Sequence, residues 1–225
     1  PLIATLLLTT TLLSGCHVTS YTEEVHVHNS DTTEAAVSYD LASVHGMAPE
    51  ESFHFPLHGQ DSDGDRWSGH VTKRGLSGRW VDGIWAIPTI TELSLVHEPS
   101  GGTTHYTTTL YLDQYGKEIK LELGNGVVCY PEDTNNIPRF AQDGDYGDLS
   151  TMSCSDGSEL TGIWDLYGYP DRTADYVTLN TFWYGDTADY SIDVSQTVDT
   201  DGNITAYATT LYDELYGVTI WLYSD

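Results

Sequence analysis

YTTTLYLDQYGKEIKL, residues 106–121 of the chain, reappears as YATTLYDELYGVTIWL at residues 207–222. Every matched position is displaced by 101 residues. In each copy, Thr, Leu and Tyr fill the run before a Tyr-Gly pair and Ile and Leu alternate after it, a pattern typical of two strands joined by a turn. The recurrence of a whole hairpin predicts that the second half of the chain contains two copies of one structural unit.

The segments around these hairpins also read as short antiparallel strands. In Lys117–Leu123, Ile119, Leu121 and Leu123 alternate with Glu118, Lys120 and Glu122, which places the two sets on opposite faces. The polar stretch 199–203 separates the runs 191–198 and 204–211 and predicts a second hairpin. Since hardly any segment has a helical period, the sequence predicts an all-β, antiparallel fold.

Residues 21–58 have a different texture, with strands predicted at 21–28, 35–41 and 53–57. The pattern of strand, Asn turn, strand, Pro turn and strand loosely resembles small immunoglobulin-like sandwich modules of envelope proteins. A helix competes for the middle segment, because Asp31 and Glu34 resemble a capping box and Val37, Leu41 and Val44 share a helical face.

Each repeat also opens on a Leu-x-Gly-x-Trp motif, at Leu76–Trp80 and at Leu160–Trp164. This motif resembles the first strand of lipocalin-like meander barrels, where the Trp closes one end. The resemblance covers only these residues and carries no ligand with it. The repeat predicts that Trp80 and Trp164 occupy equivalent buried positions, and that Tyr111 and Tyr212 do so too.

The expected organisation is a small N-terminal sandwich-like module at 16–75, a first repeat at 76–130, an acidic connector at 131–159 and a second repeat at 160–225. Each repeat is long enough for a meander sheet of four or five strands. Because neither is long enough for an eight-stranded barrel, we expect the two sheets to pair into one barrel or sandwich.

Leu13-Ser14-Gly15-Cys16 follows an aliphatic run that is too short to span a bilayer. It resembles the lipobox of bacterial lipoproteins, which implies that residues 1–15 are a signal peptide and that Cys16 is lipidated. The chain would then be anchored to a membrane on the extracytoplasmic side of the cell envelope, at the outer membrane if the cell has two membranes. A buried strand or helix is the alternative.

The formal net charge of −26 excludes nucleic acid and anionic lipid headgroups as partners, because both would be repelled. Beyond Cys16 the chain has Cys129 and Cys154, at the two ends of the acidic connector. An isolated pair in an exported protein predicts a disulfide.

Two groups of residues are candidate metal ligands, although no cofactor is expected. Strand alternation predicts one solvent-facing side with four histidines and a nearby carboxylate, which would suit Zn²⁺ or Cu²⁺ or be plain surface: His26, His28, His54, His58 and Asp40. Asp61, Asp63 and Asp65 resemble the start of a calcium loop, but Arg66 and Thr72 depart from that pattern, so a solvated turn is the alternative.

Trp183, Trp221 and Tyr223 offer a third candidate surface, on which aromatic rings edged by acids could stack on sugars or be buried by another layer. No motif of nucleophile, zinc-protease or phosphate-loop type is present in the sequence. We therefore expect a non-enzymatic, lipid-anchored envelope protein with a structural or binding role. The alternatives are a metal-binding lipoprotein and a polysaccharide-binding surface protein, with envelope proteins or polysaccharide as partners.

Overall fold

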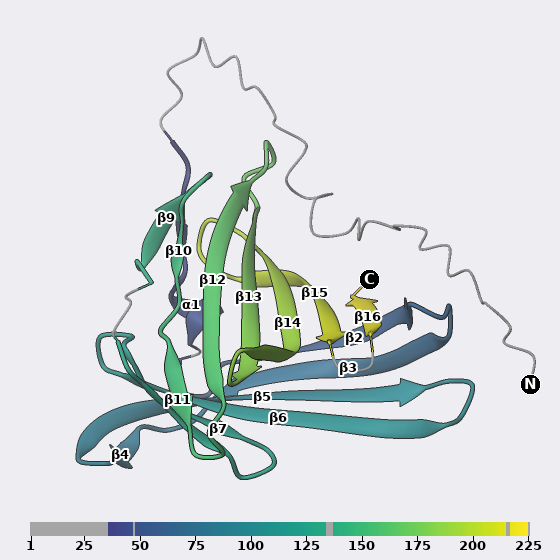
Figure 1. The fold of residues 1–225 in the computed structure, drawn as a ribbon. Coiled ribbons are helices and arrows are strands. Elements are labelled where there is room, and N and C mark those ends of the chain that lie inside the picture. Colours follow the sequence, from purple (N-terminus) through teal and green to yellow (C-terminus); the bar gives the residue numbers. More distant parts are fainter. Residues whose placement is uncertain (1–35, 47, 134–136, 215–216, 225) are drawn as a thin grey trace, which may run out of the picture. The chain divides into compact units, whose positions relative to one another are not determined.

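Two five-stranded meanders make up most of the fold (Figure 1). The computed structural model describes residues 36–46, 48–133, 137–214 and 217–224. The first meander consists of β2 (Ser52–Asp61), β3 (Arg66–Gly75), β5 (Ile84–His97), β6 (Gly102–Asp113) and β7 (Glu118–Leu123), each paired antiparallel to the next. The short strand β4 (Arg79–Val81) pairs with the start of β5.

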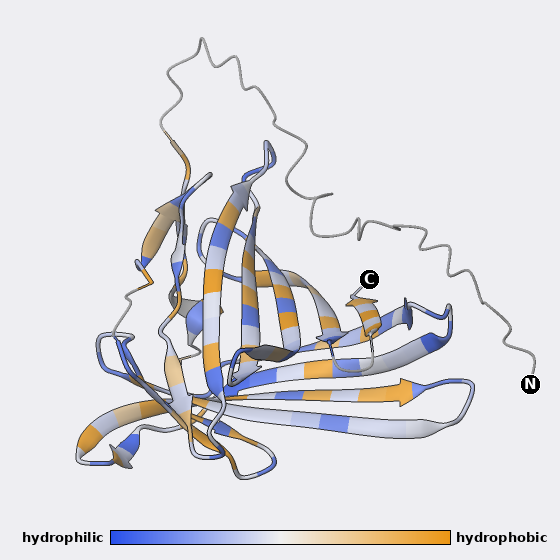
Figure 2. Cartoon of the chain, in the orientation of Figure 1, coloured by the Kyte–Doolittle hydropathy of each residue, from blue (hydrophilic) through white to orange (hydrophobic). Residues whose placement is uncertain are grey.

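The second meander repeats this topology with β12 (Glu159–Gly168), β13 (Ala174–Tyr184), β14 (Thr187–Val198), β15 (Ile204–Asp213) and β16 (Val218–Tyr223). Its strands stand at a steep angle to those of the first meander (Figure 1). Hydrophobic and hydrophilic residues alternate along β12, β13 and β14 (Figure 2), because successive side chains of a strand point to opposite faces.

The two meanders join into a closed antiparallel barrel of 12 strands. On one side β16 pairs directly with β2. On the other, β8 (Val128–Pro131) and β11 (Met152–Cys154) bridge β7 to β12, and β10 (Tyr146–Asp148) pairs with β12 further along. The all-β antiparallel fold and its barrel are therefore confirmed. The predicted disulfide is also confirmed, since Cys129 and Cys154 are bonded and are directly opposite each other in β8 and β11.

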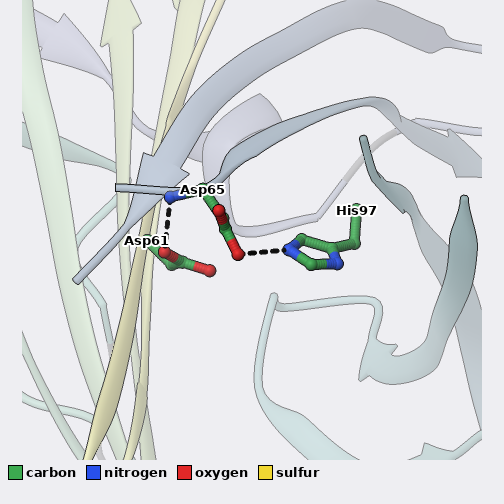
Figure 3. Close-up of side chains that lie close together, drawn as sticks. All are labelled: Asp61, Asp65 and His97. Carbon is green, nitrogen blue, oxygen red and sulfur yellow. Dashed lines mark hydrogen bonds and ion pairs between the residues drawn. The ribbon is translucent and has the colours of Figure 1, made fainter. Parts of the chain in front are cut away.

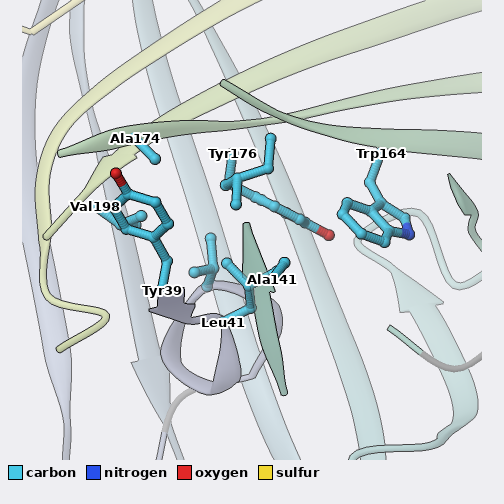
Figure 4. Close-up of a cluster of buried hydrophobic side chains, with 9 residues drawn as sticks. Tyr39, Leu41, Ala141, Trp164, Ala174, Tyr176 and Val198 are labelled. Carbon is cyan, nitrogen blue, oxygen red and sulfur yellow. The ribbon is translucent and has the colours of Figure 1, made fainter. Parts of the chain in front are cut away.

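A small plug packs against the barrel interior. It consists of β1 (Ser38–Asp40), the short helix α1 (Ala42–His45) and β9 (Phe140–Gln142), with β1 and β9 forming a two-stranded sheet. Figure 4 shows Tyr39 of the plug beside Ala174 and Val198 of the barrel, and Leu41 and Ala141 near Tyr176, with Trp164 beyond that ring. These side chains belong to one buried apolar cluster, so the plug is part of the core.

Residues 52–75, expected in a separate N-terminal module, are β2, β3 and their turn, and both strands are in the barrel. They join it because Phe53, Phe55 and Leu57 pack on Tyr207 and Leu222 of the second meander. The remaining described residues before them, from Ala36, contribute β1 and α1 to the plug. The strand predicted at 35–41 thus agrees with β1, while Val44 lies in the short helix.

The repeats agree in the place of their Tyr-Gly hairpins, but the predicted equivalence of buried positions fails for both pairs of residues. The two Tyr-Gly hairpins are the last hairpins of their meanders, β6–β7 and β15–β16, although only Tyr111 is fully buried and Tyr212 is half-buried. The Leu-x-Gly-x-Trp motifs are not equivalent. Trp80 is 71% exposed in β4, between the second and third strands of its meander, whereas Trp164 is 4% exposed in β12, the first strand of the other.

This difference predicts unequal effects of removing the two indole rings. Trp164→Ala should lower the free energy of unfolding by about 3–5 kcal/mol, because it leaves a cavity beside Tyr176. Trp80→Ala should change it by no more than about 1 kcal/mol, because Trp80 only packs edge-on against Trp85 at the surface. Urea denaturation of both variants measures the two values, and equal losses would contradict the non-equivalence of the motifs.

Candidate functional site

The barrel contains a partly open cavity of about 260 Å³. Inward-facing side chains of both meanders line it, mostly apolar ones such as Leu93, Leu110, Phe182, Ile192 and Leu211. The volume is slightly below the usual range of small-molecule sites, roughly 300–1,000 Å³, so the cavity would suit a small ligand. A mainly apolar cavity that also contains a few polar groups is the usual form of such a site.

A β-bulge in β7 turns one of these polar groups, the Glu118 carboxyl, toward the cavity. Tyr111 pairs with Lys120 but the next residue, Leu112, pairs with Glu118, so Ile119 is an extra residue in β7. The prediction that Glu118 shares one face of the strand with Lys120 and Glu122 is therefore wrong. Because the bulge shifts the alternation by one residue, Glu118 lines the cavity together with Leu121 and Leu123.

Four buried oxygen atoms in this lining have no hydrogen-bond partner among the residues that the structure describes: Glu118 Oε2, Ser150 Oγ, Tyr176 Oη and Gln196 Oε1. Their side chains are between 1% and 9% exposed. A buried polar group without a partner costs about 1–3 kcal/mol, so such groups are rare in native proteins and require an explanation. Here all four belong to one cavity.

The four groups are close to one another. Tyr176 and Gln196 are directly opposite on β13 and β14. The pKa of Tyr176 is raised by burial and by the charge of Glu118. Burial also raises the pKa of Glu118, while neighbouring Ser150 lowers it and the charge of Asp133 raises it. Glu118 is therefore near enough to Tyr176 and Ser150 to interact with them, and Tyr176 is paired with Gln196; we call these four groups of the lining the polar end of the cavity.

Two basic side chains, His45 and Lys73, complete this end. His45 Nε2 lies 3.6 Å from Glu118 Oε1, and burial together with the charge of Lys73 lowers the pKa of His45 to about 3. The imidazole is therefore neutral near pH 7. The Lys73 ammonium donates a hydrogen bond to the carbonyl of Val44 in α1, and burial lowers its pKa to about 8.

The predicted histidine surface is only partly brought together. As expected, Phe53, Phe55 and Leu57 point into the core and His54 and His58 do not. His54 bonds Thr72 and packs on His70, while the ring of His58 packs on Tyr223. Asp40 lies in β1 of the plug and binds Arg139. His26 and His28, like Cys16, lie outside the described residues.

In the described part of the chain, one group of His, Cys, Asp and Glu side chains has ligand atoms within 4.8 Å of one another: Asp61, Asp65 and His97 (Figure 3). It includes two of the three predicted calcium ligands, whereas Asp63 contributes its backbone amide to Asp61 Oδ1. His97 Nε2 lies 3.1 Å from Asp65 Oδ2.

Both oxygens of Asp61 are already engaged. Oδ1 accepts from the amides of Asp63 and Asp65, and Oδ2 accepts from the Trp67 indole. Burial alone would raise the pKa of Asp61, but these hydrogen bonds and His97 lower it overall. A cation would have to compete with these bonds, so the group acts as the scaffold of the β2–β3 turn.

The predicted aromatic surface is divided. Trp221 and Tyr223 are exposed on the outer face of β16, while Trp183 lies in β13 and donates to Thr161. β14 and β15 separate β13 from β16, a distance of about 14 Å at the usual strand spacing. These three rings therefore do not form one stacking surface.

Sequence reasoning missed the polar end of the cavity, although part of it leaves a signal. Gln196 interrupts the inward-facing series of Ile192, Val194 and Val198. A polar residue in the apolar series of a strand is the pattern to search for. No helix in the described ranges is long and apolar enough to cross a membrane.

The sequence matches no family model, and no curated protein or solved structure is significantly similar to it.

The low pKa of Lys73 makes stability depend on pH. The Lys73 side chain is protonated below about pH 10.5 in the unfolded chain and below about pH 8 in the folded protein. Between these values folding releases a proton, so the free energy of unfolding rises with pH. The stabilisation is complete above pH 10.5 and is lost as the pH falls to about 8, where the folded protein has to bury the ammonium charge. Raising the pH from about 8 to about 9.5 should therefore stabilise the wild type more than Lys73→Met. Urea denaturation at the two pH values measures the difference, and identical pH dependence in both proteins would contradict the burial of this charge.

Proposed function

We propose that this chain is a non-enzymatic binding protein of the cell envelope, anchored through a lipid on Cys16, that holds a small and mainly apolar molecule inside its barrel. The observation that carries the proposal is the cavity of about 260 Å³ with four unpartnered buried oxygens at one end. The envelope location rests on the resemblance of residues 13–16 to a lipobox.

A bound ligand can stabilise the cavity in two ways, through its apolar lining and through its polar atoms. An apolar lining gains free energy by excluding water from an apolar ligand, by about 25 cal/mol for each Å² that is buried. The polar atoms lose their hydration when the barrel folds, and a ligand that bonds to them offsets this cost. The cavity therefore favours a molecule with an apolar body and one polar end.

The metal-binding and polysaccharide-binding alternatives have weaker support. The oxygens of Asp61 are occupied by hydrogen bonds, and Asp40, His54 and His58 are not among the side chains whose ligand atoms cluster. Trp183 is separated from Trp221 and Tyr223 by two strands. Neither arrangement offers a preformed site.

A matched pair of variants on β6 tests the proposal. Thr108 lines the cavity, whereas its neighbour Thr107 is exposed on the outside. The uncharged fluorescent probe N-phenyl-1-naphthylamine should bind the wild type saturably. Thr108→Phe fills part of the cavity and should raise the dissociation constant of the probe by about tenfold or more, while Thr107→Phe should leave it unchanged.

Fluorescence titration gives the three dissociation constants, and thermal unfolding confirms that both variants are folded. Absence of saturable binding to the wild type would refute an accessible cavity. Equal affinity of all three proteins would mean that the probe binds at the surface of the protein, and this result would also contradict the proposal.

A further inference from the structure

The chemistry of the polar end identifies the head group of the ligand. All four unpartnered atoms are oxygens, and each can accept a hydrogen bond. One belongs to a carboxyl group, one to an amide carbonyl and two to hydroxyls. The carboxylate oxygen of Glu118 and the amide oxygen of Gln196 can only accept, so a ligand that meets both must donate more than one hydrogen bond.

The acidic side chain of Glu118 gives the polar end a charge that would attract a cationic head group. Glu118 is 9% exposed, and the nearest basic group, His45, lies 3.6 Å from Oε1 but is neutral. Lys73 also lines the cavity and is protonated below its pKa of about 8, but its ammonium donates to the carbonyl of Val44 rather than to Glu118. When the Glu118 carboxyl is ionised, burial without a hydrogen-bonded cation is costly, and a ligand cation beside Oε2 offsets that cost.

We propose, on the basis of the binding function above, that the ligand is an amphiphilic primary amine whose ammonium group donates to Glu118, Gln196 and Tyr176 while its apolar body fills the barrel. An ammonium group has three donors and no acceptor, which fits a set of oxygens better than other head groups. A carboxylate would bring a second anion to Glu118. An alcohol has a single donor and leaves most of the oxygens unpaired.

The net negative charge of the whole chain also favours a cationic ligand. Its net charge of −26 attracts cations and repels anions, so it raises the local concentration of an amine relative to a fatty acid. This attraction is screened by salt, whereas the contact with Glu118 inside the barrel is screened much less. The preference for the amine should therefore persist in 0.5 M NaCl.

Three probes of equal chain length test the head group: octylamine, 1-octanol and octanoate, each displacing N-phenyl-1-naphthylamine from the full chain at pH 7 in 0.5 M NaCl. Octylamine should bind at least about tenfold more tightly than 1-octanol, and octanoate should bind most weakly. The Glu118→Gln variant should lose the preference for octylamine and keep its affinity for 1-octanol within about threefold.

Glu122→Gln is the matched control, because Glu122 lies on the outer face of the same strand, bonded to Tyr111 and Lys120. It should retain the preference for octylamine. Since the ranking of the probes is measured in the wild type, the test does not depend on the folding of either variant.

The proposal is overturned if 1-octanol or octanoate binds as tightly as octylamine, or if Glu118→Gln retains the preference. Equal displacement by all three probes refutes the amine head group but leaves the binding function intact. Failure of N-phenyl-1-naphthylamine and of all three probes to bind refutes both.

Discussion

Closure of the barrel along two seams is the constraint on which the rest of the structure depends. At one seam β16 pairs with β2, and the backbones approach so closely that a Cβ atom on Gly59 would lie 1.7 Å from the carbonyl oxygen of Trp221. Only glycine fits at this position. At the other seam the very short strands β8 and β11 connect the meanders, and the Cys129–Cys154 disulfide fixes their alignment. The short strands at this second seam form few backbone hydrogen bonds. The disulfide therefore provides much of the stability of the seam.

A closed barrel of this size has a consequence for its interior. About eight strands give an interior that side chains can just fill, and the interior widens with strand number. Twelve strands leave more space. The chain fills one part with β1, α1 and β9, and Tyr39, Leu41 and Val44 extend the apolar core there. The remaining space is the cavity, and α1 brings His45 to its polar end. Fold and candidate site are therefore linked, since the same plug that stabilises the core defines the pocket.

Much of the fold could be predicted from the sequence because its signals are local. Alternation in 191–198 and 204–211 predicts β14 and β15, the repeated Tyr-Gly motif predicts the last hairpin of each meander, and the isolated cysteine pair predicts the disulfide. The failures have non-local causes. Leu-x-Gly-x-Trp is a short motif whose two copies fold in different contexts, so Trp80 is exposed and Trp164 is buried. Alternation also assumes an unbroken ladder, and the bulge that turns Glu118 inward depends on the pairing of β7 with β6. The site combines side chains from β7, β13, β14 and α1, and their proximity follows only from barrel closure.

Amide hydrogen exchange across the two seams tests barrel closure most directly. A closed barrel predicts that the bonded amides of the β2–β16 pairs and of the β8–β11 pairs exchange far more slowly than exposed amides. Their protection should fall only when the whole barrel unfolds, together with that of β5 and β6. Rapid exchange at either seam, with β5, β6, β13 and β14 still protected, would mean an open sheet with free edges, and would contradict both the closed barrel and the site inside it.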